Sequence, residues 1–179
     1  MSSVAVEDLV FIDESGILVG IQRLVARALV GQRAYARKPF YRGEKLSIVG
    51  AITQTGVLAY DTLKGSFNGE SFLEFVQHRL VPQLWQGAVV VMGNLSVHKV
   101  TGVVEAIEAA GARVVYLSPY SPEFNPIEHW WSQLKGFLRQ FAPKSIQAIE
   151  QLIEIAVMLN YPRDFHNYFS HCCYCPTSD

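Results

Sequence analysis

Two acidic residues stand where a carboxylate could reach the edge of a folded core. Asp13 directly follows the apolar run 9–12, and Glu128 opens a helical segment after a Pro-rich loop. Carboxylate oxygens are the hard ligands that Mg²⁺ requires. Each residue also has a plainer interpretation, because Asp13 lies in a turn-like Asp-Glu-Ser-Gly sequence and Glu128 stands three residues after Asn125, as in a helix-capping box. Taken singly, both residues favour the plainer interpretation, so a catalytic role depends on the segments around them.

Length and composition predict one domain with a substantial core. The chain has 179 residues, of which 50% are hydrophobic and 17% are charged, and this excludes a disordered chain. No apolar run approaches the roughly 18 residues of a membrane span, and the start of the chain lacks the pattern of a signal peptide. The three cysteines lie within the last eight residues and cannot form a disulfide framework, so we expect a cytoplasmic protein without a membrane partner.

The order of the apolar runs predicts an α/β fold with a mixed central sheet and helices on both faces. Strands are expected at residues 9–12, 46–53, 56–60, 88–92 and 113–117, with residues 13–16 as a turn and residues 16–24 as a hairpin partner of the first strand. Helices are expected from Asn68 to Pro82, at residues 97–110 with Gly111 as the C-terminal cap, and at residues 126–141 and 145–159.

Sheets of this kind form sites at the carboxyl ends of their strands. Two positions meet that condition here. Asp13 follows the first expected strand, and Gly93-Asn94 follows the strand at residues 88–92. We therefore expect a functional site to include both ends.

Three segments together resemble one protein family. They are Phe11-Ile12-Asp13-Glu14-Ser15, Gly93-Asn94-Leu95-Ser96-Val97-His98-Lys99, and the stretch from Leu117 to Trp131, which contains Tyr-Ser-Pro-x-x-Asn-Pro-Ile-Glu. The last motif is too long and specific for a chance match. The chain resembles the catalytic domain of DDE transposases of bacterial insertion sequences, in the mariner superfamily, over nearly its whole length, including Gly50-Ala51-Ile52.

The resemblance implies an RNase H-like fold, with a mixed five-stranded sheet flanked by helices over residues 1–160 and a C-terminal tail at residues 161–179. It also implies metal-dependent cleavage of DNA strands and strand transfer of an insertion sequence, with two Mg²⁺ or Mn²⁺ ions. In the family's Asp-Asp-Glu triad, Asp13 matches the first acid, a ligand of both ions, and Glu128 matches the third, a ligand of one.

The second acid of the triad is missing. Its position is occupied by Gly93, and the 34 residues between Gly93 and Glu128 match the separation in many relatives. Glycine offers no carboxylate, and the adjacent Asn94, like Glu14 beside Asp13, would point to the other side of its strand. We expect the fold to survive this change, the metal site to be weakened, and DNA cleavage to be weak or absent.

The resemblance also implies DNA as the partner. The net charge of −1 does not indicate this, but seven of the fifteen basic residues lie between residues 22 and 45. The candidate DNA-binding residues are Arg33, Arg37, Lys38, Arg42 and Lys99. Relatives read element ends with an N-terminal helix-turn-helix region. Only twelve residues precede Asp13, so we expect a separate helix-turn-helix polypeptide as a partner. A homodimer is a further expected assembly. The expected location is the bacterial cytoplasm, in association with the nucleoid.

Two other functions stay open at this point. One is a catalytically inactive DNA-binding or assembly protein derived from a transposase, and the other is a general RNase H-like nuclease that needs no element ends. The C-x-x-C spacing at Cys172 to Cys175 is typical of zinc ligands, but a second ligand pair is missing, so a reduced, partly frayed tail is expected. Trp130 and Trp131 are expected in the core.

Overall fold

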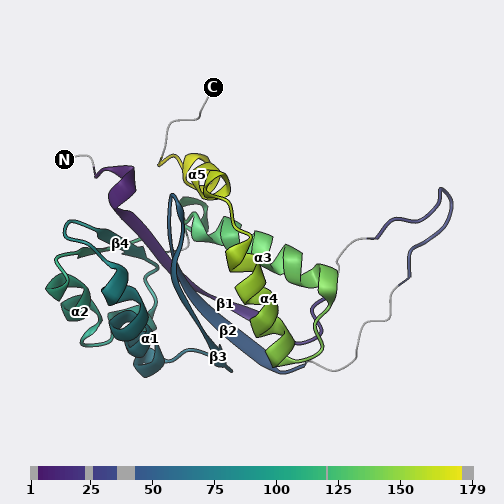
Figure 1. Cartoon of the computed structure of the whole chain (residues 1–179), viewed down its shortest axis with the longest axis horizontal. Helices are drawn as coiled ribbons and strands as arrows, with labels where there is room; N and C mark the ends of the chain where they lie inside the picture. Colours follow the sequence, from purple (N-terminus) through teal and green to yellow (C-terminus); the bar gives the residue numbers. More distant parts are fainter. Residues whose placement is uncertain (1–3, 23–25, 36–42, 120, 175–179) are drawn as a thin grey trace.

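Five strands form one mixed sheet in the computed structural model, which describes residues 4–22, 26–35, 43–119 and 121–174. The strands are β1 (Leu9–Leu18), β2 (Lys45–Thr53), β3 (Gly56–Lys64), β4 (Val89–Met92) and β5 (Arg113–Tyr116), and their order across the sheet is β3-β2-β1-β4-β5. The first three strands pair antiparallel, whereas β1, β4 and β5 run parallel. The predicted mixed sheet with helices on both faces is confirmed (Figure 1).

The first strand is longer than its sequence indicates. The turn predicted from Asp13 is wrong, because β1 continues through this residue to Leu18 in an unbroken antiparallel pairing with β2. The predicted hairpin partner at residues 16–24 is therefore wrong where it overlaps β1, at residues 16–18, and residues 23 and 24 lie outside the described residues. Hydrogen bonds to β2 satisfy the backbone of these turn-type residues, which removes their local reason to bend. The parallel pairing of β1 with β4 ends at Ile12 and Met92, so Asp13 stands just beyond it.

The helices α1 (Gly69–Phe75) and α2 (Val103–Ala109) lie on one face of the sheet, with the short helical turns η2 (Val76–Leu80), η3 (Val81–Gln83) and η4 (Ser96–Lys99). Asn68 caps α1 as predicted, since its side chain accepts a hydrogen bond from the backbone of Ser71. The helix predicted at residues 97–110 is wrong in its first turns. Gly102 has a left-handed backbone (φ 100°), which separates η4 from α2.

The opposite face is covered by α3 (Ile127–Phe141), α4 (Ile146–Met158) and α5 (Pro162–His171). The first two helices were predicted, but α5 was not. The expected C-terminal tail at residues 161–179 includes this helix, in which Phe165 and Phe169 are fully buried and Phe169 packs edge-on against Phe11 at 5.3 Å between ring centroids. No helix within the described ranges is long and apolar enough to cross a membrane.

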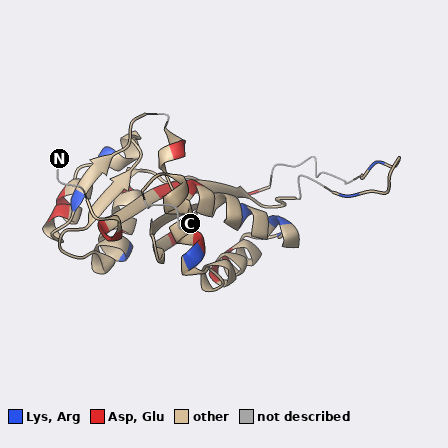
Figure 2. Ribbon diagram, turned by 90° about the horizontal axis from the view of Figure 1, so that it is seen from above, with Lys and Arg blue, Asp and Glu red and all other residues tan. Residues whose placement is uncertain are grey.

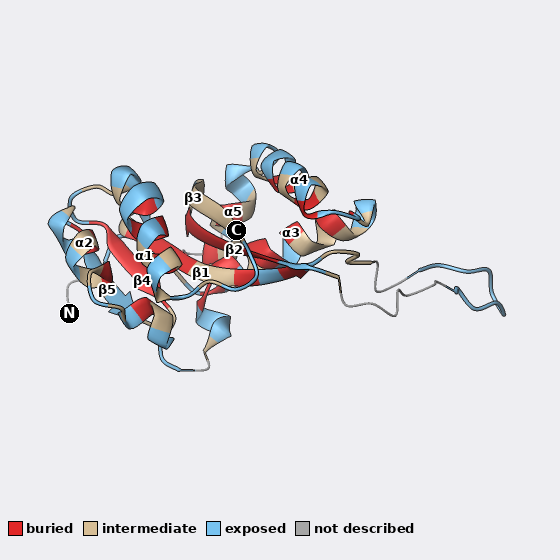
Figure 3. Ribbon diagram, turned by 90° about the horizontal axis from the view of Figure 1, so that it is seen from below, coloured by how far each residue is buried: buried red, intermediate tan, exposed pale blue. Residues whose placement is uncertain are grey.

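Buried residues extend along β1, β2 and β4 (Figure 3). Alternate residues of β1 belong to two separate hydrophobic cores. Leu9 and Phe11 belong to the core beneath α3, α4 and α5, whereas Val10 and Ile12 belong to the core beneath α1 and α2. This two-residue period is the ordinary consequence of the strand's pleat. This alternation places Asp13 on the face of the sheet that α3 covers and Glu14 on the face that α1 covers.

A glycine in β2 allows α3 to approach the sheet closely. Gly50 pairs with Asp13, and a Cβ atom built on it would lie 2.6 Å from the ring of Trp130 and 3.0 Å from that of Trp131. Both tryptophans are buried, as predicted, with ring centroids 4.4 Å apart. The indole rings therefore rest directly on the backbone of β2 where it passes Asp13.

We predict that Gly50→Ala destabilises the protein by about 1–3 kcal/mol, because the added methyl overlaps two rings that are packed on all sides. Gly136→Ala is the matched control: a Cβ there meets nothing within 4 Å, and Gly136 lies inside α3. That control should raise stability by up to about 1 kcal/mol, since alanine favours helix. Urea unfolding of both variants measures the difference, and equal stabilities for the two would contradict the close approach.

Candidate active site

One cleft of about 360 Å³ contains both acids predicted from the sequence. Asp13 reaches it from β1, Gly93 from the turn after β4, and Glu128 from the first turn of α3. The remaining lining residues come from the turn after β4 and from the loop between β5 and α3: Asn94, Leu95, Leu117, Ser118, Pro119, Ser121, Pro122 and Asn125. The cleft lies at the carboxyl end of β4, where the sheet order places a site.

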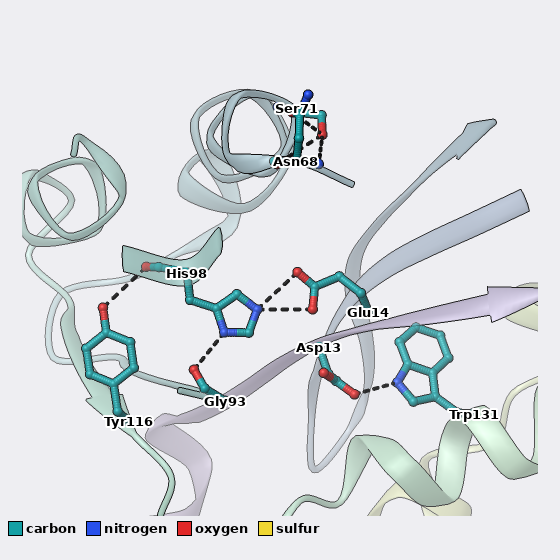
Figure 4. A network of polar contacts seen from close by, with 8 residues as sticks. All are labelled: Asp13, Glu14, Asn68, Ser71, Gly93, His98, Tyr116 and Trp131. Carbon is teal, nitrogen blue, oxygen red and sulfur yellow. Dashed lines mark hydrogen bonds and ion pairs between the residues drawn. The ribbon is translucent and has the colours of Figure 1, made fainter. Parts of the chain in front are cut away.

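The carboxylate of Asp13 is held on the α3 side of the sheet. Its Oδ2 accepts a hydrogen bond of 3.2 Å from the indole nitrogen of Trp131 (Figure 4). Burial and the negative charges of Glu14 and Glu128 raise the pKa of Asp13 from 3.8 to about 7, although the bond from Trp131 opposes this. A carboxylate that is disfavoured in this way near neutral pH is stabilised by a nearby cation.

Glu128 does not take part in a helix cap. The capping box expected from Asn125 is wrong, because α3 starts after Pro126 with no side-chain cap, and the amide of Glu128 donates instead to the backbone oxygen of Asn125. The side chain of Glu128 is exposed at the cleft. The side-chain oxygen of Asn125 is buried there without a hydrogen-bond partner among the described residues, so a bound donor or cation would satisfy it.

Position 93 has room for a side chain but offers none. A Cβ atom on Gly93 would meet only the ring of His98, at 3.5 Å, which is ordinary van der Waals contact. Its backbone needs no left-handed conformation. Within the described ranges, no group of three His, Cys, Asp or Glu side chains is placed to hold a metal ion. Among the described residues the cleft has two carboxylates, from Asp13 and Glu128, and position 93, where the resemblance implies a third, supplies none.

Glu14 is directed to the other face of the sheet. Both of its carboxylate oxygens lie 3.0 Å from Nε2 of His98, and Nδ1 of that ring lies 2.6 Å from the backbone oxygen of Gly93 (Figure 4). His98 has no exposed surface. Burial lowers the pKa of His98, but its hydrogen bond to Glu14 and the charge of that carboxylate outweigh the burial, and the net pKa is raised.

Of the candidate DNA-binding residues, the two that the structure describes, Arg33 and Lys99, do not line the cleft. Arg33 is exposed in segment 26–35, which projects away from the sheet (Figures 1 and 2). Lys99 is exposed at the end of η4, with its amine 5.7 Å from the ring centroid of Tyr116. Arg37, Lys38 and Arg42 lie outside the described residues.

Sequence reasoning missed three residues that organise the cleft. Trp131 was placed in the core but not against Asp13, His98 was treated only as the neighbour of Lys99, and Asn125 was considered only as a helix cap. The spacing of Trp131, three residues after Glu128, could have indicated it, because residues i and i+3 share a helix face. The contact of His98 with Glu14 spans 84 residues and has no local signal.

Comparison with known proteins agrees with this geometry. The family model described as DDE superfamily endonuclease matches residues 8–153. A pre-cleavage Mos1 transpososome has a TM-score of 0.75 and 17% identity, covering 93% of this chain and 53% of that chain. The catalytic domain of Mos1 mariner transposase has a TM-score of 0.68 and 15% identity, covering 93% and 78%. A comparison with curated proteins found no match.

The chain spans about half of the transposase chain in the transpososome. The structural likeness shows that the mixed five-stranded sheet and its flanking helices form the RNase H-like fold. The family match covers most of the sequence, from the strand that bears Asp13 to helix α4, which lies beyond Glu128. The chain therefore belongs to the DDE superfamily endonucleases.

Proposed function

We propose that this chain is the catalytic domain of a DNA transposase, with a site for metal-dependent strand cleavage and strand transfer of an insertion sequence, impaired by Gly93. The observation that supports this most is the shared cleft of Asp13, Gly93 and Glu128. The solved relatives include mariner Mos1 paired-end complexes with Mn and with Mg, which favours Mg²⁺ or Mn²⁺ as the cofactor here.

The residues of the cleft fit a divalent cation in part. Asp13 and Glu128 supply hard oxygen ligands. The raised pKa of Asp13 reflects a carboxylate whose charge is disfavoured by burial and by neighbouring acids, and a bound cation would stabilise that charge. Two such ions, when bound, would clamp the attacking and leaving oxygens of a phosphodiester. Trp131 orients the Asp13 carboxylate through Oδ2, and the first turn of α3 brings Glu128 to the same cleft.

Gly93 removes the third ligand without disturbing its surroundings. Losing one charge-stabilising group from an active site costs roughly 3–4 kcal/mol in the barrier, and losing an ionic metal ligand costs at least as much. The second candidate function follows from the same residue: a catalytically inactive protein, derived from a transposase, that binds DNA or assembles with active copies. The inactive function is favoured by the absence of a side chain at Gly93, whereas the transposase function is favoured by the presence of Asp13 and Glu128.

Partners beyond DNA follow from the family rather than from the cleft. The solved relatives form transpososomes and paired-end complexes, which supports DNA ends as the substrate of this chain. End recognition by a separate helix-turn-helix polypeptide, a homodimer, and DNA contacts by Arg33 and Lys99 remain predictions. Both cations are exposed and so are accessible to a phosphate backbone.

We predict that Gly93→Asp tightens Mg²⁺ binding by about tenfold or more and speeds Mn²⁺-dependent nicking of supercoiled plasmid by about 100-fold or more, because it restores a carboxylate to the cleft. Gly93→Asn is the matched control, since it fills the same space without charge and should leave both quantities near those of the parent chain. Calorimetric titration with Mg²⁺ and a gel assay of plasmid forms measure the two effects.

The same assay separates the candidate functions. A parent chain that nicks DNA as fast as Gly93→Asp would overturn the proposed impairment. Retardation of DNA in EDTA, with no nicking by either chain, would favour the inactive DNA-binding protein. Nicking of a plasmid without element ends as fast as of one that carries them would indicate a general RNase H-like nuclease instead.

A second prediction concerns pH. Because the pKa of Asp13 is about 7 in the folded chain and 3.8 in the unfolded chain, only the folded chain holds this proton between those values. In EDTA, the contribution of Asp13 to stability should thus be complete below about pH 4 and fall, by a few kcal/mol at most, as the pH rises to about 7. Asp13→Asn should remove this slope and be the more stable protein at pH 8.

Urea unfolding from pH 4 to pH 8 tests this, and other titrating groups cancel in the comparison of the two chains. Mg²⁺ at pH 8 should stabilise the parent chain more than Asp13→Asn, since the ion binds the ionised carboxylate. Parallel pH profiles for the two proteins would show that Asp13 titrates normally and would contradict the geometry described above.

A further inference from the structure

His98 occupies the junction of four segments on the face opposite Asp13. Its ring contacts Glu14 of β1 and the backbone of Gly93, and it packs against the ring of Phe72 in α1 at 4.8 Å between centroids. Its backbone oxygen accepts a hydrogen bond of 3.3 Å from the hydroxyl of Tyr116 at the end of β5. A polar ring with no exposed surface and both nitrogens engaged is fixed in one orientation.

Both contacts of the ring nitrogens are with acceptors. The Gly93 carbonyl accepts at Nδ1, so that nitrogen carries a hydrogen, and one further proton lies between Nε2 and the Glu14 carboxylate. Every polar atom of the ring is thereby satisfied inside the protein. The ring leaves no nitrogen for a metal or a substrate, so any role in the reaction is indirect.

The bridge through His98 connects β1 to the segment after β4, beyond the point where the pairing of these two strands ends. The ladder between β1 and β4 ends at Ile12 and Met92, one residue before Asp13 and Gly93. Beyond that point, among the described residues, the carbonyl of Gly93 is tied to β1 through His98 and Glu14. Since Glu14 directly follows Asp13, the bridge relates the backbone at position 93 to the backbone that bears Asp13.

We propose that His98 is a positioning residue, which holds the turn after β4 so that position 93 faces Asp13 across the cleft. This rests on the proposed function of the cleft. A Cβ atom at position 93 would lie 3.5 Å from Cε1 of His98, in van der Waals contact, so the ring also limits where a side chain there can start. The parent chain keeps the bridge and lacks only the side chain that it would orient.

Two variants of Glu14 with the same charge separate the two cases, because one breaks the bridge and the other keeps it. Glu14→Ala and Glu14→Gln both remove the carboxylate's charge, but the side-chain amide of glutamine can still bond to the ring, since its NH2 donates to Nε2 when the neutral ring keeps its hydrogen on Nδ1. In Glu14→Ala, backbone ¹⁵N order parameters of residues 93–95 should fall from about 0.85, typical of rigid backbone, to below about 0.6. Glu14→Gln should keep the parent values.

His98→Gln breaks the bridge at its other end, and its order parameters should fall at the same residues. Phe72→Leu is the control for general loosening, because it disturbs packing around the ring without removing a hydrogen bond. It should lower the unfolding midpoint while residues 93–95 stay ordered. Unchanged order parameters in Glu14→Ala and His98→Gln, or an equal fall in Phe72→Leu, would overturn the proposal.

A double-mutant cycle then joins the bridge to the metal site. Gly93→Asp should tighten Mg²⁺ binding about tenfold in the parent and Glu14→Gln backgrounds, but less than about threefold with Glu14→Ala. An undiminished gain with Glu14→Ala would overturn positioning by His98. No gain from Gly93→Asp in any background would count against the proposed metal function alone, and the order parameters would still decide whether the bridge holds the turn.

Discussion

The close contact between α3 and the sheet at Gly50 determines where the site can form. Two indole rings lie against β2 at the one residue that has no side chain to keep them away. This contact brings Trp131 within hydrogen-bond distance of Asp13, and it sets the start of the same helix, with Glu128, at the cleft. A side chain at position 50 would collide with both rings, so the indole nitrogen would have to move away from the carboxylate.

Strand β1 carries two adjacent carboxylates with different roles: that of Asp13 lies at the cleft, and that of Glu14 binds His98 inside the protein. Asp13 faces the cleft and is poised near neutral pH by its surroundings, whereas Glu14 faces inward and is engaged by His98 (Figure 4). The pleat of the strand separates the two roles, because neighbouring side chains point to opposite faces. The same alternation places Val91 of β4 in the α3 core and Met92 in the α1 core.

The sheet could be predicted from its apolar runs, because β1, β2 and β4 each contain consecutive buried residues and glycine or proline separates most strands from the next element. The errors arose where tertiary structure overrides local preference. Asp13 lies in a turn-type sequence, but pairing with β2 keeps it extended, and Gly102 interrupts a helix whose apolar spacing is continuous. Asp13 and Glu128 could be named from their motifs, but Trp131 and His98 depend on distances between elements, which no local pattern contains.

The opposite orientations of Asp13 and Glu14 also limit how the gene can vary in length. Deleting or inserting one codon within β1 would reverse every later side chain of the strand, turning the cleft carboxylate inward and the bridging one outward. The last pair of the β1–β2 ladder is Leu18 with Lys45, and the connection between the two strands lies outside the ladder. Residues 26–35 of this connection project away from the sheet. Length polymorphism between homologous copies is therefore compatible with that connection, while the strand itself must keep its residue count.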